Sequence, residues 1–195
     1  MKISHGLITV AATLVALVAT AVPAHATDDT YTPIGTDITF VGSDITFTPS
    51  ATGQGLTCSQ FDLHGQVDDA GVSRGYGHPA VTFGGLTTSG CTSSFQMDGL
   101  WSFTVTGAEV GSVSPAQLSD VSLFVDASGC SFHVAGNITG DYDDATGEFA
   151  TSSSSLVITD APSGFVCGIL GLAQGQSVEG GGSWQSVPPV IITSP

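Results

Sequence analysis

Ser73 lies in a short motif that is typical of a hydrolase nucleophile. Residues 71–75 read G-V-S-R-G and match G-x-S-x-G, a strand-to-helix turn that exposes a serine hydroxyl. The chain holds 26 Gly among 195 residues, so this pattern also arises by chance. Residues 75–79, G-Y-G-H-P, favour a loop over a helix. We therefore predict a long hairpin loop around Ser73, and we keep an exported hydrolase that uses Ser73 as an alternative function.

Three histidines, His64, His78 and His133, follow the N-terminal region. A general base or a metal site would need two or more of them close together, and their spacing does not indicate this. We expect His64 and His133 on solvated strand faces and His78 in an exposed Gly-rich loop. The chain has no Gly-rich phosphate loop and no C-x-x-C motif. We predict no cofactor and assign no catalytic residue.

Four carboxylates, Asp141, Asp143, Asp144 and Glu148, stand close together in the sequence. Carboxylate oxygens are the ligands that calcium prefers, so this group is a candidate calcium site. The same stretch favours a type I turn from Asp143 to Thr146 with Gly147 in the left-handed conformation. We predict the turn alone and keep the turn with bound calcium as the alternative.

The charge excludes some classes of partner. The chain has 17 Asp and Glu against 2 Lys and Arg, a formal net charge of −15. Lys2 lies in a predicted leader, which leaves Arg74 as the fixed cation of the mature chain. Such a surface cannot neutralise phosphates, so we predict no binding to nucleic acid or anionic lipid. The partner is otherwise unknown; self-association and cell-surface components are the candidates.

Residues 1–26 resemble a secretory signal peptide. Lys2 supplies the positive region, residues 8–22 are apolar, and Ala24-His25-Ala26 is an A-x-A site for cleavage after Ala26. A membrane anchor is the alternative, but the apolar run is shorter than the about 20 residues that span a bilayer. We expect no membrane span and one β-rich domain over residues 27–195, secreted or held at the cell surface.

The cysteines of an exported protein are more typical of disulfides than of a metal site. An internal duplication, about residues 36–107 and 116–187, aligns Cys58 with Cys130, and each unit has the order strand, Cys, hairpin, Cys, Trp. It predicts the bridges Cys58–Cys91 and Cys130–Cys167. The alternative is an immunoglobulin-like plan in which Cys91, Trp101 and Cys167 supply the cysteine-tryptophan-cysteine pattern.

Alternation of apolar and polar residues predicts half-buried strands, for example at Trp101–Val105 and at Phe132–Ile138. With frequent turn signals, it indicates an all-β fold, an antiparallel sandwich or barrel built from two similar disulfide-containing units. Residues 114–119, which start with Ser-Pro, predict one short helical turn. The apolar run at residues 165–173 predicts a buried strand that contains Cys167.

Two further segments have alternative interpretations. Residues 35–41 and 42–48 nearly repeat each other, and a hairpin with a turn at Gly42-Ser43 puts the apolar residues of both copies on one face. One long bent strand with a bulge at Gly42 is the alternative. The tail at residues 187–195 is β-prone and bounded by prolines, which favours an edge strand. Donation of Val190 to Ile192 to a neighbouring molecule, as in a surface fibre, is the other interpretation.

Two motifs carry a family resemblance. Residues 101–105 read W-S-F-T-V, and residues 130–136 read C-S-F-x-V-x-G. Together with the leader and the four spaced cysteines, they resemble small secreted bacterial proteins known as activators of alkane oxidation. The resemblance implies a role at the cell surface during growth on hydrophobic substrates and supplies no catalytic residues. We expect a non-enzymatic β-domain for adhesion, matrix building or hydrophobic-ligand binding, with the Ser73 hydrolase and a strand-donating fibre subunit as alternatives.

Overall fold

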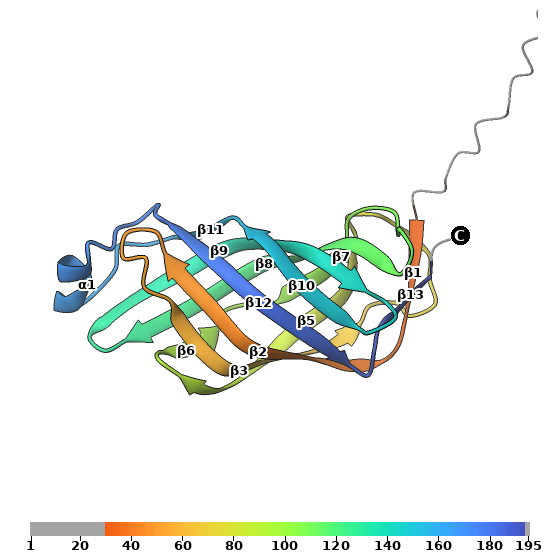
Figure 1. The fold of residues 1–195 in the computed structure, drawn as a ribbon, viewed down its shortest axis with the longest axis horizontal. Coiled ribbons are helices and arrows are strands. Elements are labelled where there is room, and N and C mark those ends of the chain that lie inside the picture. Colours follow the sequence, from red (N-terminus) through yellow and green to blue (C-terminus); the bar gives the residue numbers. More distant parts are fainter. Residues whose placement is uncertain (1–29, 194–195) are drawn as a thin grey trace, which may run out of the picture.

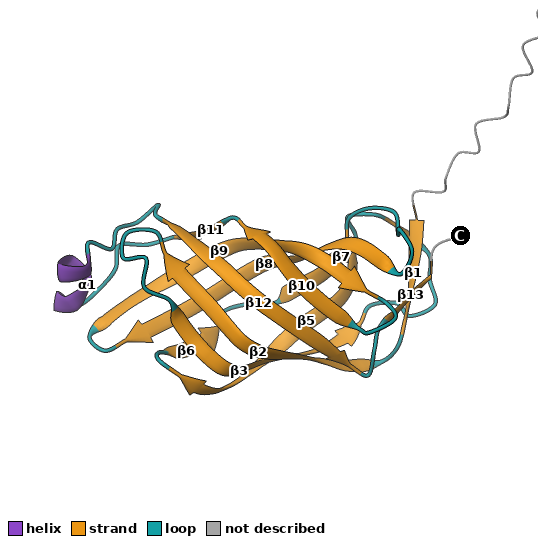
Figure 2. Ribbon diagram, viewed as in Figure 1, coloured by secondary structure: helices purple, strands orange, loops and turns teal. Residues whose placement is uncertain are grey.

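The computed structural model describes residues 30–193, and the predicted leader with its cleavage position after Ala26 lies outside them. Strands make up most of the described chain, and a single short helix stands at one end (Figure 2). In chain order the elements are β1 (Thr30–Ile34), β2 (Asp37–Pro49), β3 (Leu56–Val67), β4 (Arg74–Gly75), β5 (Pro79–Cys91), β6 (Ser94–Met97), β7 (Trp101–Val105), β8 (Val113–Ala127), β9 (Cys130–Asp143), β10 (Glu148–Ser154), β11 (Leu156–Ile158), α1 (Phe165–Leu170), β12 (Ser177–Val187) and β13 (Ile191–Thr193). Among these residues, no helix is long and apolar enough to cross a membrane.

Eight strands close into an antiparallel barrel in the order β2-β3-β5-β7-β8-β9-β10-β12, and β12 returns to β2 (Figure 1). The order around the barrel follows the order in the chain, so each strand pairs with the next along the sequence. The predicted all-β antiparallel class is confirmed, and of the two architectures expected, the barrel is formed. The interior of an eight-stranded barrel is just wide enough to be filled by side chains.

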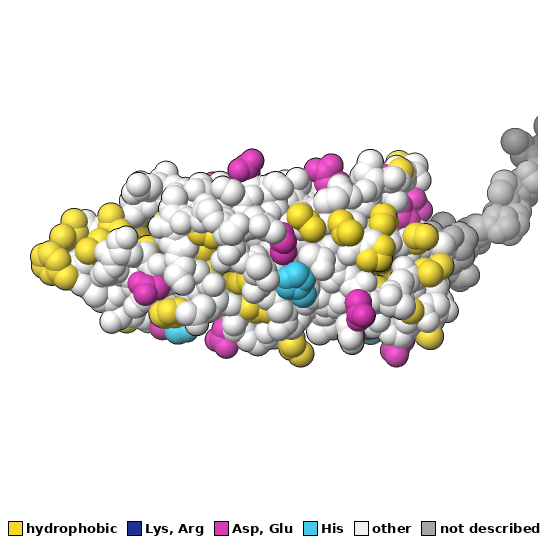
Figure 3. All heavy atoms as spheres, turned by 90° about the horizontal axis from the view of Figure 1, so that it is seen from below, with side chains coloured by type: hydrophobic (Ala, Val, Ile, Leu, Met, Phe, Trp, Pro, Cys, Tyr) yellow, Lys and Arg dark blue, Asp and Glu magenta, His cyan; other side chains and the backbone are white. Residues whose placement is uncertain are grey.

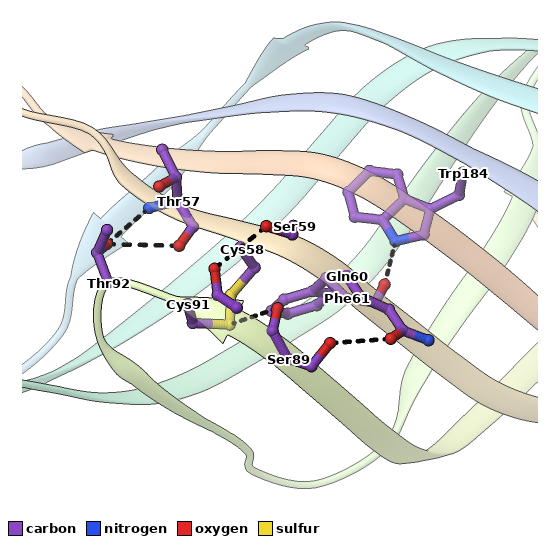
Figure 4. Close-up of a disulfide and its surroundings, with 10 residues drawn as sticks. Thr57, Cys58, Ser59, Gln60, Phe61, Ser89, Cys91, Thr92 and Trp184 are labelled. Carbon is purple, nitrogen blue, oxygen red and sulfur yellow. Dashed lines mark hydrogen bonds between the residues drawn. A yellow bond between two sulfur atoms is a disulfide. The ribbon is translucent and has the colours of Figure 1, made fainter.

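Aromatic side chains fill the barrel axis because the strands alternate inward and outward residues. The fully buried rings on the barrel strands are Trp101, Trp184, Tyr142, Phe40, Phe61, Phe83, Phe103 and Phe149. Trp184 lies opposite Gly42 of β2, and its indole Nε1 donates to the carbonyl oxygen of Phe61 at 3.0 Å (Figure 4). A Cβ on Gly42 would lie 2.5 Å from that Nε1, so glycine is required where the ring crosses the strand.

The predicted hairpin at Gly42-Ser43 is wrong, because both copies of the repeat lie in the single strand β2. Asp44 has φ +52, and the register between β2 and β12 shifts by one residue beside it. This bulge resets the alternation, so Phe40 before it and Ile45 after it both point into the core. The alternative of one long bulged strand is the correct one, with the left-handed residue at Asp44 instead of Gly42.

The predicted helical turn at residues 114–119 and the predicted buried strand at residues 165–173 are also wrong. Residues 114–119 form part of β8, where Ser114, Ala116 and Leu118 are buried in alternation and pair with β9. Residues 165–170 form α1 instead of a buried strand, and within the helix only Cys167 is buried. Its neighbours β11 and β12 pair with each other and with other strands, so no nearby sheet edge receives this segment. The expectation of at most one short helix holds, at a different place in the chain.

Two disulfides join Cys58 to Cys91 and Cys130 to Cys167, the pairing that the duplication predicts. The immunoglobulin-like plan is therefore wrong. Cys58 and Cys91 lie directly opposite each other on β3 and β5 (Figure 4). The duplication itself, and a single domain over residues 27–195, stay predictions.

A three-stranded sheet, in the order β13-β1-β4, covers one end of the barrel, and α1 stands at the other end (Figure 1). β13 is an edge strand of this sheet, as the proline-bounded tail predicts. Val190 and Ile192 are buried within their own chain, at 1% and 3% exposure. The segment considered for donation to a neighbour is therefore already used in the fold.

Candidate functional site: an apolar tip on a filled barrel

Ser73 lies exposed in the loop that joins β3 and β5. The two-residue strand β4 follows it at once, so the helix of a nucleophile elbow is not formed there. Arg74 donates to the carbonyl oxygens of Asp68, Asp69 and Pro79, which ties the loop to the start of β5. The predicted hairpin loop is confirmed. The hydrogen bonds of Arg74 hold its shape.

The histidines lie apart and have separate partners. The ring of His64 hydrogen-bonds the hydroxyls of Thr39 at 3.1 Å and Thr87 at 2.9 Å. The Nδ1 of His133 contacts Asp160 at 2.8 Å. In the barrel wall, three strands separate β3, which carries His64, from β9, which carries His133. Across residues 30–193, no group of three or more His, Cys, Asp or Glu side chains is arranged to hold a metal ion.

His78 is exposed beside Arg74, and its backbone carbonyl accepts a hydrogen bond from the hydroxyl of Tyr31. His78 and Arg74 line an open hollow at the end of the barrel, together with Asp68, Asp69 and Pro79. Tyr31 itself is buried, and burial raises its pKa to about 12. The role of His78 that the structure shows is thus to anchor β1 through its main chain.

The four clustered carboxylates turn to different partners. The side chain of Ser112 lowers the pKa of Asp143, and the backbone N–H of Ala145, which donates to Asp143 at 2.9 Å, lowers it further. Gly147 has φ +76, so the predicted turn with a left-handed glycine is confirmed. Asp141 and Glu148 are exposed on neighbouring strands. Asp143 is thus engaged in its own turn, and bound calcium stays the untested alternative.

Asp144 is the carboxylate whose surroundings are most unusual. Both of its oxygens accept a hydrogen bond from the backbone N–H of Ile192, each at 3.0 Å. Asp144 therefore holds β13 against the barrel. Burial raises its pKa to about 6, and the nearby charges of Glu109 and Asp143 add to this effect. Its role in the described structure is to secure the C-terminal strand.

The helix α1 presents an apolar surface to solvent. Phe165 and Ile169 are 85% and 68% exposed, and a spacing of four residues puts them on one face of the helix. α1 has no acidic residue in its first turn and no basic residue in its last turn. Hydrophobic side chains gather at this end of the molecule in Figure 3. We name the pair Phe165 and Ile169 the apolar tip.

Beneath the apolar tip lies a hollow of about 30 Å³. Its apolar lining includes Leu56, Ala127, Phe132, Leu170 and Leu172. This volume has room for only a few water molecules and is far below the about 300–1,000 Å³ of a ligand pocket, so the hollow does not enclose a guest molecule. The surface that this end offers to a partner is therefore the tip itself.

A family model described as "Alkane oxidation protein activator PraA/PraB-like" matches residues 1–176. The chain belongs to this family. No curated protein matches the chain, and no solved structure matches it. The matched residues of this PraA/PraB-like chain include both disulfides and α1, and they end just before β12.

The apolar tip of this PraA/PraB-like protein was not among the sequence-predicted sites. Residues 165–173 are apolar and contain β-branched residues, which favours a buried strand. The signal that could have found the helix was glycine: Gly164 precedes α1, and Gly171 follows it with φ +68, a left-handed conformation typical of a helix C-terminus.

Proposed function

We propose that the protein is a non-enzymatic accessory factor of alkane oxidation that adsorbs through its apolar tip to an uncharged hydrophobic phase outside the cell. The observation that carries the proposal is the exposure of Phe165 and Ile169 at the end of a barrel whose own axis is filled by aromatic rings. Membership of a family described as alkane oxidation activators supports it. A filled interior favours contact at the surface over enclosure of a ligand.

Charge favours an uncharged phase over a membrane. The chain has a formal net charge of −15, and Arg74 is the one cation among residues 30–193. An anionic bilayer attracts basic segments and repels such a protein. A hydrocarbon surface presents no fixed charge of this kind, so the two apolar side chains can be buried in it without that repulsion.

The size of the tip favours a continuous phase over a protein partner. Stable protein interfaces bury about 800 Å² on each partner, and two side chains supply only a fraction of that area. Burying one Phe or Ile side chain stabilises by about 1.5–3 kcal/mol. At the exposed fractions of Phe165 and Ile169 the pair contributes about 2–4 kcal/mol, enough for reversible adsorption.

The compartment also belongs to this proposal. Two disulfides indicate an oxidising environment. The predicted leader of residues 1–26 supports export. Release from the cell, or attachment at its surface, would place the protein where water-insoluble alkanes are met.

The test is depletion of the purified protein from water by droplets of hexadecane. The double variant Phe165→Ser with Ile169→Ser is expected to lower the partition constant by about 30- to 900-fold, from the loss of about 2–4 kcal/mol. Val110→Ser is the matched control, because Val110 is 81% exposed in the loop between β7 and β8. Anionic phosphatidylglycerol vesicles are expected to bind none of these proteins.

Equal adsorption of the double variant and the unchanged protein would refute a role for the tip. A loss of adsorption in the Val110 variant of the same size would show that general surface hydrophobicity, and not α1, is responsible.

A further inference from the structure

We infer that the Cys130–Cys167 disulfide presents the apolar tip, so that opening this one bridge releases α1 and weakens adsorption while the barrel stays folded. The inference rests on the proposed function, because it concerns the control of the same surface. Such a role requires that the bridge is the main anchor of α1, with only partly buried side chains such as Val166 and Leu172 beside it.

α1 is not stable by its own sequence. It has six residues, whereas isolated helices shorter than about 12–15 residues are marginal in water. Gly168 lies inside it, and Val166 and Ile169 are β-branched, which lowers its helix propensity further. Gly164 at its N-terminus makes no side-chain cap. The helix therefore depends on its attachment to the barrel.

That attachment is narrow and centres on the disulfide. Cys167 is the single buried residue of α1, at 2% exposure, and it is bonded to Cys130 at the start of β9. Around this bond, Gly164 packs directly on the turn between β8 and β9: a Cβ on Gly164 would lie 2.2 Å from the carbonyl oxygen of Gly129. Val166 touches the same glycine. Leu170 lines the hollow beneath the tip.

The chain on both sides of α1 is held by other bonds. Before the helix, Ser163 and Ser131 exchange two backbone hydrogen bonds of 2.8 Å. After it, the N–H of Gly175 donates to Ile158 at 2.8 Å. These backbone bonds limit the segment that opening the bridge would loosen to residues 164–174. At its C-terminal end, Gln174 donates to the carbonyl oxygen of Thr159 at 2.7 Å, and the side chain of Gln176 bonds Gly171 and Ala173 at 3.0 Å. The part that is freed is therefore the helix at residues 165–170.

The Cys58–Cys91 disulfide is a control, because opening it breaks the same kind of bond away from α1. Cys58 and Cys91 face each other across β3 and β5, and the ladder of these two strands continues from Cys58 to Val67. Backbone pairing already holds the two residues opposite each other, so opening this bridge leaves the strands paired. It also lies outside α1 and its supports.

A dithiol can reduce the Cys130–Cys167 bond without any other reactant. The dithiol transfers two electrons and two protons, the bond between the two Sγ atoms breaks, and Cys130 and Cys167 each become a thiol. The reductant becomes its own cyclic disulfide. Once α1 is freed, its six residues must lose conformational entropy before Phe165 and Ile169 bind a surface together, which weakens adsorption.

The experiment compares two double variants, Cys130→Ser with Cys167→Ser and Cys58→Ser with Cys91→Ser. Three measurements are made on each: hexadecane adsorption, amide hydrogen exchange over residues 164–174, and near-ultraviolet circular dichroism of the buried Trp101 and Trp184. The first variant is expected to keep the dichroism, to exchange rapidly in that segment and to lose adsorption by about tenfold or more. The second is expected to adsorb like the unchanged protein.

If the first variant adsorbs as strongly as the parent protein, the inference about the bridge is overturned and the proposed function still stands. Failure of the unchanged protein to adsorb would refute the proposed function itself. If the first variant does not fold, graded reduction of the unchanged protein, with peptide mapping of the open bridge, decides the matter. Loss of adsorption must then follow the opening of Cys130–Cys167; loss that follows Cys58–Cys91 would overturn the inference.

Discussion

Asp144→Asn tests how much the burial of the ionised Asp144 carboxylate, which holds β13, lowers the free energy of unfolding. The side chain accepts the N–H of Ile192 at 3.0 Å, and burial raises its pKa from 3.8 to about 6. Between these two pH values the folded protein binds a proton that the unfolded chain has released. This group therefore makes the free energy of unfolding fall as the pH rises from about 4 to 6, and above that its full cost is present.

The magnitude follows from the size of the pKa shift. One pKa unit corresponds to about 1.4 kcal/mol, so a shift of about two units gives about 3 kcal/mol at most. Asp144 is only partly buried, and solvent screening reduces this to about 1–2 kcal/mol. An asparagine keeps an oxygen that accepts the Ile192 N–H and has no charge to desolvate. The variant is expected to be more stable by about 1–2 kcal/mol near pH 7.5, and equally stable near pH 3.5.

The assay is urea unfolding at several pH values, followed by the fluorescence of Trp101 and Trp184. Asp141→Asn, at an exposed position on β9, is the control and is expected to leave the profile unchanged. If Asp144→Asn is less stable than the unchanged protein near pH 7.5, the ionised carboxylate contributes more through its hydrogen bond than it costs by burial. A net destabilising role for the charge of Asp144 would then be refuted.

Three further predictions concern the packing around Gly42, the structural role of Arg74 and calcium. Gly42→Ala is expected to lower the free energy of unfolding by about 1–3 kcal/mol in urea, because the added Cβ meets the Trp184 ring. Gly55→Ala is the control, because its added Cβ would have no neighbour nearer than 3.5 Å, and it is expected to unfold like the unchanged protein. Arg74→Met is expected to lower stability by about 2–3 kcal/mol in urea unfolding, because three carbonyl oxygens lose a charged donor; an unchanged midpoint would refute a structural role for the arginine. Thermal melting is expected to be the same with calcium and with a chelator; an increase in Tm with calcium that Asp143→Asn removes would instead favour the calcium alternative at Asp141, Asp143, Asp144 and Glu148.

Several elements of the fold could be predicted because their signals are local. Alternating residues at Trp101–Val105 form β7, and those at Phe132–Ile138 form part of β9. The turn at residues 143–147 requires only a short Asp-rich sequence with a glycine in the left-handed position. In these cases the interacting residues are close along the chain, so the sequence contains the whole cause.

Other elements depended on what lies beside them. A hairpin and a bulged strand both bring Phe40 and Ile45 to one face, so the sequence did not distinguish them. The choice was made by β3 and β12, which pair along both halves of β2. Residues 165–170 suit a buried strand by composition, but their surroundings offer no edge, and the bridge to Cys130 holds them outside the barrel.

By itself, the sequence determined the class of fold, the spacing of the strands and the acidic character of the surface, because these follow from the period and composition of neighbouring residues. Only the tertiary structure decided that the strands close into a barrel, that aromatic rings fill its axis, and that Phe165 and Ile169 lie exposed at its end. These features arise from contacts between segments far apart in the chain, such as Trp184 with Phe61. A pattern read along one segment contains no information about which distant segment will cover it.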